Sequence, residues 1–113
     1  MIQVFLVKDD NLWTKLEVTG HADYADYGKD IVCAGISTAV LMSINLLERI
    51  IPNCFDLIQN EKKGYISLTH LQYNNLEKET ISFVNTIFEN LKDTLLDFQA
   101  SYPNNLLIKI ENK

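Results

Sequence analysis

Apolar residues alternate with other residues over two short stretches near the start of the chain. Ile2, Val4 and Leu6 alternate, and after the polar run 8–11 the alternation resumes over residues 12–18. A period of two places the apolar side chains on one face of a strand, and a short polar run between two such stretches is typical of a turn. These residues therefore predict a β-hairpin.

The apolar period changes to three and four residues between Ile31 and Ile51, which predicts a helix closed by Pro52. The stripe consists of Val32, Ile36, Val40, Ser43, Leu47 and Ile50, widened by Ala39, Met42 and Leu46. This stripe is wider than packing on one sheet face requires. Part of it is therefore expected to be covered by a second copy of the chain.

The rest of the chain predicts two further strands, a second helix and a last strand. The strands at 54–59 and 64–71 flank a polar turn, and a last strand spans 106–110. Asn74 or Asn75 is expected to cap the second helix, which ends before Pro103. The apolar face of that helix is carried by Val84, Ile87, Phe88, Leu91, Leu95 and Phe98.

The resulting order is ββαββαβ, and no repeat, linker or low-complexity tract divides it. Residues 1–113 are therefore expected to form a single α+β domain of two layers, with two helices packed on a mixed or antiparallel sheet.

Composition and charge exclude several classes of protein. Apolar residues make up 47% of the chain and charged residues 22%, as in an ordinary globular domain, and the net charge of −5 comes without a Lys/Arg cluster. Direct binding to nucleic acid is therefore not expected. Ser, Thr and Asn interrupt the apolar stretch 31–47 and Glu48 and Arg49 follow it, so we expect no membrane span.

Two cysteines do not make a disulfide framework, and the N-terminal residues lack a basic region followed by a small-residue cleavage site. The sequence therefore predicts a cytoplasmic protein whose thiols are reduced.

The segment from Gly20 to Ser37 joins the second predicted strand to the first predicted helix and carries the candidate chemistry. If Asp30 is the helix N-cap, Cys33 is the third helical residue, where backbone N–H groups lack a partner within the helix and the helix dipole is positive. A cysteine so placed, with a histidine such as His21 nearby, can have a pKa well below the free value of about 8.5. The thiolate is the nucleophilic form.

Cys33 is therefore the predicted nucleophile, and His21 is the predicted proton-transfer partner if the fold brings its ring within hydrogen-bond reach of the sulfur. The N–H groups of Cys33 and Ala34 are candidate oxyanion donors. Ser37 lies one helical turn after Cys33 on the same face, where its hydroxyl can orient the sulfur or a substrate carbonyl.

A metal site is the main chemical alternative for the same segment, because its residues include the types that bind zinc: His21, Asp23, Asp26, Asp30 and Cys33. No compact Cys/His pair spacing is present, and a coordinated thiolate would be a poor free nucleophile. We therefore expect no metal and no other cofactor.

Several residues also have a purely structural interpretation. Asp30 can be a helix cap with or without a role in the site. Tyr24 and Tyr27 can cover the loop or contact substrate, and the residue types do not decide between these. Cys54 and His70 are assigned no function.

The segment closely resembles the ribosomal-processing cysteine protease family (Prp) over 18 consecutive positions. The matching pieces are Gly20-His21-Ala22, Tyr24-Ala25-Asp26, Gly28-Lys29-Asp30, Asp30-Ile31-Val32-Cys33-Ala34 and Ser37. Chain length and element order also agree with the family.

The resemblance implies a homodimeric endopeptidase that removes a short N-terminal leader from a bacterial large-subunit ribosomal protein, the twenty-seventh of the L series, and so supports ribosome assembly. It implies that Cys33 and His21 form the catalytic dyad and that Asp30 and Ser37 support it. The alternative from another class is a non-catalytic dimeric α/β module that binds a ribosomal protein or an assembly factor.

The leader in this family ends in aromatic residues, which makes Tyr24, Tyr27 and Gly28 the expected substrate loop. Two positions depart from the family pattern: Asp23 stands where Gly is common, and Gly35 where Ala is common. Neither departure removes a catalytic atom.

Overall fold

The structure, a computed structural model, describes residues 1–20, 27–60 and 63–113, with the side chains of residues 27–30 left out. Strands β1 (Ile2–Asp9) and β2 (Leu12–Thr19) form the predicted hairpin. Asp10 and Asn11 at its tip have φ values of 51° and 65°. Asp and Asn tolerate this left-handed conformation, which tight hairpin turns require.

The hairpin is the centre of a five-stranded sheet with the order β3-β4-β2-β1-β5. Strands β3 (Asp56–Asn60) and β4 (Tyr65–Thr69) form a second antiparallel pair, while β5 (Leu106–Asn112) runs parallel to β1. The sheet is therefore mixed, and the predicted order ββαββαβ is confirmed.

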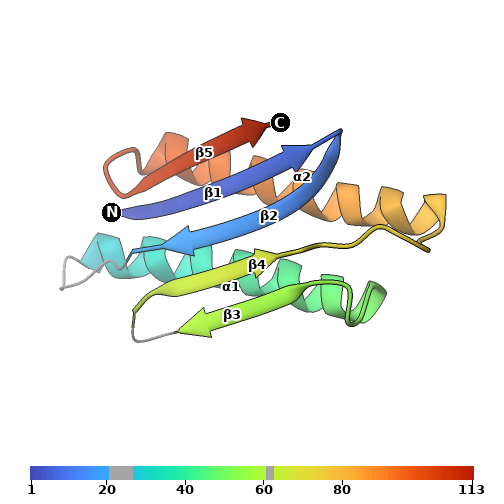
Figure 1. Cartoon of the computed structure of the whole chain (residues 1–113). Helices are drawn as coiled ribbons and strands as arrows, with labels where there is room; N and C mark the ends of the chain where they lie inside the picture. Colours follow the sequence, from blue (N-terminus) through green and yellow to red (C-terminus); the bar gives the residue numbers. More distant parts are fainter. Residues whose placement is uncertain (21–26, 61–62) are drawn as a thin grey trace.

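Helices α1 (Tyr27–Ile50) and α2 (Lys78–Ser101) lie side by side on one face of the sheet (Figure 1). The core lies between the two layers. Val84, Ile87, Phe88, Leu91 and Leu95 of α2 are buried in it, as the apolar spacing predicted.

Two predicted helix starts are wrong. Glu77, not Asn74 or Asn75, is the N-cap residue of α2, and Asn75 has a φ of 70° in the preceding turn. Helix α1 begins at Tyr27, so Asp30 is its fourth residue rather than its cap. An aspartate is favoured both as an N-cap and within the first helical turn. The residue type of Asp30 therefore could not show which of these positions it occupies.

The buried stripe of α1 consists of Val32, Ile36, Val40, Ile44 and Leu47, with Ile51 just after the helix. Ile44 and Ile51 take the places of the predicted Ser43 and Ile50 in the buried stripe, while Ile50 is partly buried against the core. Met42 and Leu46, predicted to widen the stripe, are 72% and 45% exposed.

Residues Ile31–Ile50 are long and apolar enough to span a membrane, with a mean hydropathy of 1.8. The core helix of a soluble protein shares this property, and one face of α1 is buried against the sheet.

An aromatic cluster fixes α2 on the sheet at the end of β1. Trp13 stacks on Phe88 with 5.8 Å between ring centroids, and the ammonium group of Lys8 lies 4.8 Å from the Trp13 ring. The hydroxyl of Tyr73 donates a hydrogen bond to the carbonyl oxygen of Trp13 at 2.6 Å. Burial raises the pKa of Tyr73 to about 12, so this donor keeps its proton at neutral pH.

Candidate active site

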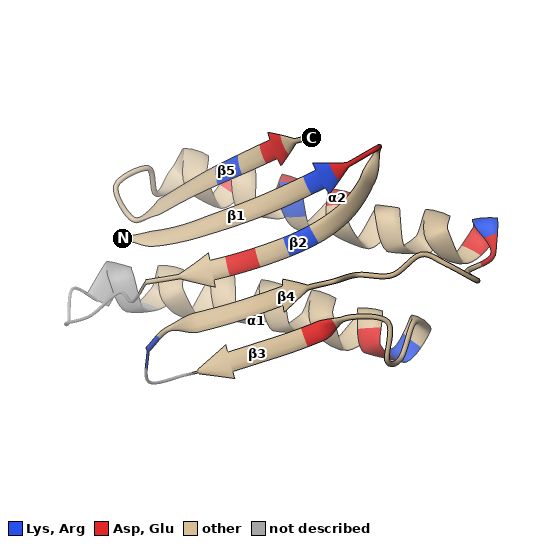
Figure 2. Ribbon diagram, viewed as in Figure 1, with Lys and Arg blue, Asp and Glu red and all other residues tan. Residues whose placement is uncertain are grey.

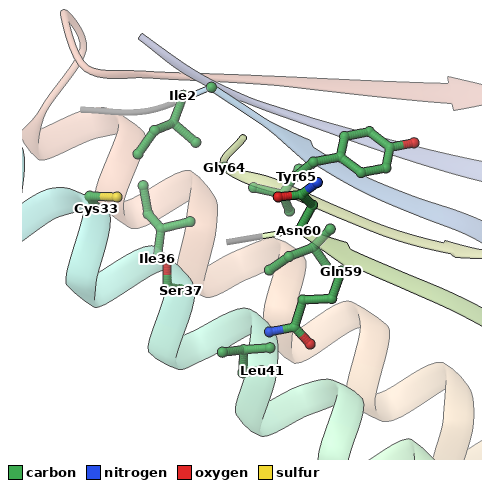
Figure 3. Close-up of a pocket in the computed structure, with 12 residues that line it drawn as sticks. Ile2, Cys33, Ile36, Ser37, Leu41, Gln59, Asn60, Gly64 and Tyr65 are labelled. Carbon is green, nitrogen blue, oxygen red and sulfur yellow. The ribbon is translucent and has the colours of Figure 1, made fainter. Parts of the chain in front are cut away.

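A cavity of about 220 Å³ lies between the first half of α1 and the sheet (Figure 3). Three parts of the chain line it. The hairpin contributes Ile2, Val18 and Gly20; helix α1 contributes Cys33, Ile36, Ser37 and Leu41; the second strand pair contributes Gln59, Asn60, Gly64, Tyr65 and Ile66.

Cys33 and Ser37 lie together on the cavity side of α1, as their spacing predicted (Figure 3). Cys33 is half-buried and packs against the core, where the buried Val32 and Ile36 hold the helix on the sheet. Its sulfur is therefore both fixed in place and accessible from the cavity. Ser37 is half-buried as well.

The earlier start of α1 changes the predicted electrostatics of Cys33. Cys33 is the seventh helical residue rather than the third, and Ala34 is the eighth. The helix dipole acts mainly within the first turn, and amides this far into a helix face a carbonyl one turn earlier. The assignment of Cys33 and Ala34 as oxyanion donors thus loses its first-turn rationale and stays a prediction.

His21 and Tyr24 lie outside the described residues, so the predicted dyad stays a prediction. The structure describes the backbone of Tyr27, Gly28 and Asp30, which form part of the first turn of α1, but not their side chains. Their roles as substrate loop and supporting residue likewise stay predictions.

Gly20, the residue before His21, lines the cavity that contains Cys33. It has a φ of 99°, and a Cβ added there would collide with the backbone carbonyl oxygen of Met1. Only glycine fits this conformation and this close approach. Gly20 thus turns the chain after β2 at the cavity, one position before His21 in the sequence.

The wall formed by the second strand pair was missed from the sequence. Gln59 and Asn60 end β3, Gly64 belongs to the following turn, and Tyr65 and Ile66 begin β4. The two strands were predicted, but the place of their cavity-lining residues beside α1 depends on β4 pairing with β2. One signal was present: after Phe55 and Leu57, the alternation places a polar residue, Gln59, at a position that otherwise faces the core.

Within the described ranges, no three His, Cys, Asp or Glu side chains gather into a set that could hold a metal ion. His21, Asp23 and Asp26, which the zinc alternative would use, lie outside those ranges.

The remaining histidine and cysteine lie elsewhere. His70 Nδ1 is 2.8 Å from the Asp56 carboxylate, and both side chains are largely exposed at the surface. The Cys54 thiol donates to the carbonyl oxygen of Pro52 at 3.6 Å. Neither residue lines the cavity that contains Cys33.

A free thiol and a hydroxyl that line one small, mostly apolar cavity define a site suited to binding an apolar substrate side chain and to nucleophilic attack on the adjoining carbonyl. The fold places this site on a two-layer α+β domain. These features are typical of a small thiol hydrolase.

Comparisons with known proteins identify the family. Residues 1–107 match the family model described as cysteine protease Prp. A ribosomal processing cysteine protease Prp of Staphylococcus aureus is 32% identical over 75 residues, which cover 66% of this chain and 71% of that protein. The chain belongs to the Prp family of ribosomal-processing cysteine proteases.

Solved structures agree with this assignment. A Streptococcus mutans protein superposes with a TM-score of 0.83 at 26% identity and covers 100% of this chain and 96% of its own. The S. aureus Prp with a covalently linked product peptide gives a TM-score of 0.76 at 27% identity, with 100% of both chains covered. The S. aureus Prp with a substrate peptide has a TM-score of 0.80 at 22% identity over 97% of this chain and 99% of that chain, which supports the fold.

Proposed function

We propose that this protein is an endopeptidase that removes the N-terminal leader of a bacterial large-subunit ribosomal protein, the twenty-seventh of the L series, with Cys33 as nucleophile. The observation that carries the proposal is the half-buried Cys33 thiol in a cavity next to Ser37. Membership of the Prp family supports it, and the S. aureus Prp has been solved with a covalently linked product peptide.

The reaction would proceed in two steps. The Cys33 sulfur attacks the scissile carbonyl carbon while His21 takes the thiol proton, and the tetrahedral intermediate expels the new amine after His21 protonates it. Water, activated by the same imidazole, then hydrolyses the thioester and releases the leader. Asp30 and Ser37 are proposed to support the dyad. For the amides of Cys33 and Ala34 to act as the proposed oxyanion donors, they would have to release the carbonyls one turn earlier in α1.

The cavity fits the apolar end of such a leader. Its lining contains no charged residue within the described part of the chain, so burial of a charged substrate side chain would be costly there. A volume of about 220 Å³ is smaller than a drug-sized ligand pocket. It suits one large apolar or aromatic side chain next to the cut. Tyr24, Tyr27 and Gly28 are proposed to complete the substrate loop.

The test is cleavage of a synthetic peptide that carries the leader and its junction. Wild-type protein should cut it at the junction, and the matched variant Cys54→Ala should cut it equally well. Cys33→Ala should abolish cleavage, and His21→Ala should lower kcat/KM by at least about 100-fold, the lower range of proton-transfer catalysis. Cleavage that survives Cys33→Ala would remove the assigned nucleophile. Binding without cleavage by the wild type would favour the non-catalytic module instead.

Two further proposals concern the setting of the enzyme. We propose that it acts as a homodimer, because Met42 and Leu46 leave an apolar surface on α1. We also propose that it works in the bacterial cytoplasm, where ribosomal proteins are made. No direct role in nucleic-acid binding is proposed, since positive and negative residues are intermingled over the described elements (Figure 2).

A further inference from the structure

One row of side chains crosses the sheet at the level of the cavity and faces the helices. Val4 is paired with Val18, Val18 with Ile66, and Ile66 with Gln59. Directly paired residues share a face of the sheet. Val4 and Val18 are buried and Ile66 is partly buried, so the row is apolar until it reaches the edge strand β3.

Gln59 ends this row with a polar side chain. Leu57, two residues earlier on the same face, packs against the core, whereas Ile58 on the opposite face is 59% exposed. Gln59 therefore points toward α1, and its carboxamide lies near Leu41, about two helical turns along α1 from Cys33 in the same cavity (Figure 3). Another apolar residue here would have extended the core.

The chemistry of a carboxamide matches that of a peptide group. Its oxygen accepts hydrogen bonds and its NH₂ group donates them, so it can pair with both the N–H and the C=O of a peptide main chain. In a mostly apolar site, a few polar groups fix the orientation of the bound molecule. Gln59 is exposed, and no hydrogen bond joins its side chain to another described residue.

We propose that Gln59 is a substrate-binding residue that hydrogen-bonds the main chain of the bound peptide and so sets the position of the scissile carbonyl relative to Cys33. This role rests on the proposed function. The NH₂ group of Gln59 would donate a hydrogen bond to a substrate carbonyl, and its side-chain oxygen would accept one from a substrate N–H. The cleavage site then depends on the main chain at this point as well as on the side chain in the cavity.

The test separates binding from cleavage by using Cys33→Ala as the background. A fluorescein-labelled peptide with the leader and junction is titrated, and its Kd is measured by fluorescence anisotropy. Adding Gln59→Leu, which keeps the size but loses both hydrogen-bonding groups, should weaken binding by about 5- to 20-fold. Adding Ile58→Leu, on the opposite face of the same strand, should leave Kd unchanged.

A second arm locates the contact. Single N-methyl groups are introduced along the peptide, each of which removes one main-chain donor. At one position, methylation should weaken binding to the Cys33→Ala protein but not to the Cys33→Ala/Gln59→Leu protein. Such non-additivity is expected when two changes remove the same hydrogen bond. In the otherwise wild-type enzyme, Gln59→Leu should raise KM and leave the rate of Cys33 alkylation by iodoacetamide unchanged.

The outcomes distinguish this role from the proposed function. Equal Kd values with and without Gln59→Leu would overturn the role of Gln59 even if the wild type cleaves the peptide. Binding that depends on Gln59 in a protein that never cleaves would support the role and reject the protease. A Cys33→Ala protein that does not bind the peptide, together with a wild type that neither binds nor cleaves it, would overturn both.

Discussion

The proposed reactivity of Cys33 would have to come from its neighbours more than from the helix that carries it. As the seventh residue of α1, it lies beyond the turn in which the helix dipole acts most strongly. The proposed proton transfer to His21 must therefore supply most of the activation. The side chain is half-buried in the cavity wall, while Cys54 is half-buried beside a backbone carbonyl of its own turn.

This difference predicts unequal labelling of the two cysteines. Near neutral pH, iodoacetamide should alkylate Cys33 at least about tenfold faster than Cys54, because the thiolate is the reacting form. Mass spectrometry of the digested protein measures both rates in one sample. His21→Ala should bring the rates closer together, whereas the control His70→Ala should not. Equal labelling of both cysteines in the wild type would argue against an activated Cys33.

At the residue scale, the motif predicted part of the site. Cys33 and Ser37 could be placed on one face because helical spacing is local information. Gln59 and Tyr65 could not be placed beside them, because their approach to α1 follows from strand pairings between residues far apart in the sequence.

At the scale of elements, a close contact between the helices explains one departure from the family pattern. A Cβ added to Gly35 would lie 2.7 Å from Cζ of Phe98 on α2. The Phe98 ring in turn stacks on Tyr102 with 6.1 Å between centroids. Position 35 lies two residues after Cys33. Phe98 fills the space there that the methyl group of the alanine common in the family would occupy.

Gly35→Ala is therefore expected to have opposite effects in two backgrounds. In the wild type, overpacking should outweigh the gain in helix propensity and lower the free energy of unfolding by about 1 kcal/mol. With Phe98→Leu already present, only the propensity gain should remain, and the same change should stabilise by about 0.5–1 kcal/mol. Urea denaturation measures all four proteins. Equal effects in both backgrounds would mean that the two residues do not compete for space.

The existence of all seven elements could be predicted from the apolar periods, but two helix starts could not. The first turn of α1 contains Tyr27 and Gly28, which carry no apolar stripe, so the period became visible only from Ile31. The capping residue of α2, Glu77, makes no side-chain capping hydrogen bond. An N-cap preference based on Asn therefore pointed to the wrong residue.

At the scale of the whole molecule, the strand order was beyond sequence analysis. The parallel pairing of β1 with β5 joins the two ends of the chain (Figure 1), and a pattern within either strand contains no information about its partner. The apolar outer surface of α1, in contrast, could be predicted, because the apolar stripe of the helix is wider than packing on one sheet face requires. Met42 and Leu46 are exposed there and line a shallow groove with Arg49.

If this surface is the dimer interface, Met42→Lys should raise the dissociation constant of the dimer by at least about tenfold, because it buries a charge at an apolar contact. Phe83→Lys is the matched control, since it makes the same kind of change at an apolar residue of α2 that is 61% exposed. Sedimentation velocity over a concentration series measures both. A dimer that tolerates Met42→Lys would place the interface elsewhere, and a monomeric wild type would refute the homodimer.

The proposed reaction requires a covalent bond between the Cys33 sulfur and the carbonyl carbon at the end of the leader. The most direct measurement is intact-protein mass spectrometry of a reaction with the leader peptide, quenched in acid within the first turnover. The wild type should gain a mass equal to the acyl leader fragment, mapped to Cys33 by digestion and absent from Cys33→Ala. Cleavage without any adduct on the wild type, or an adduct on Cys54, would contradict it.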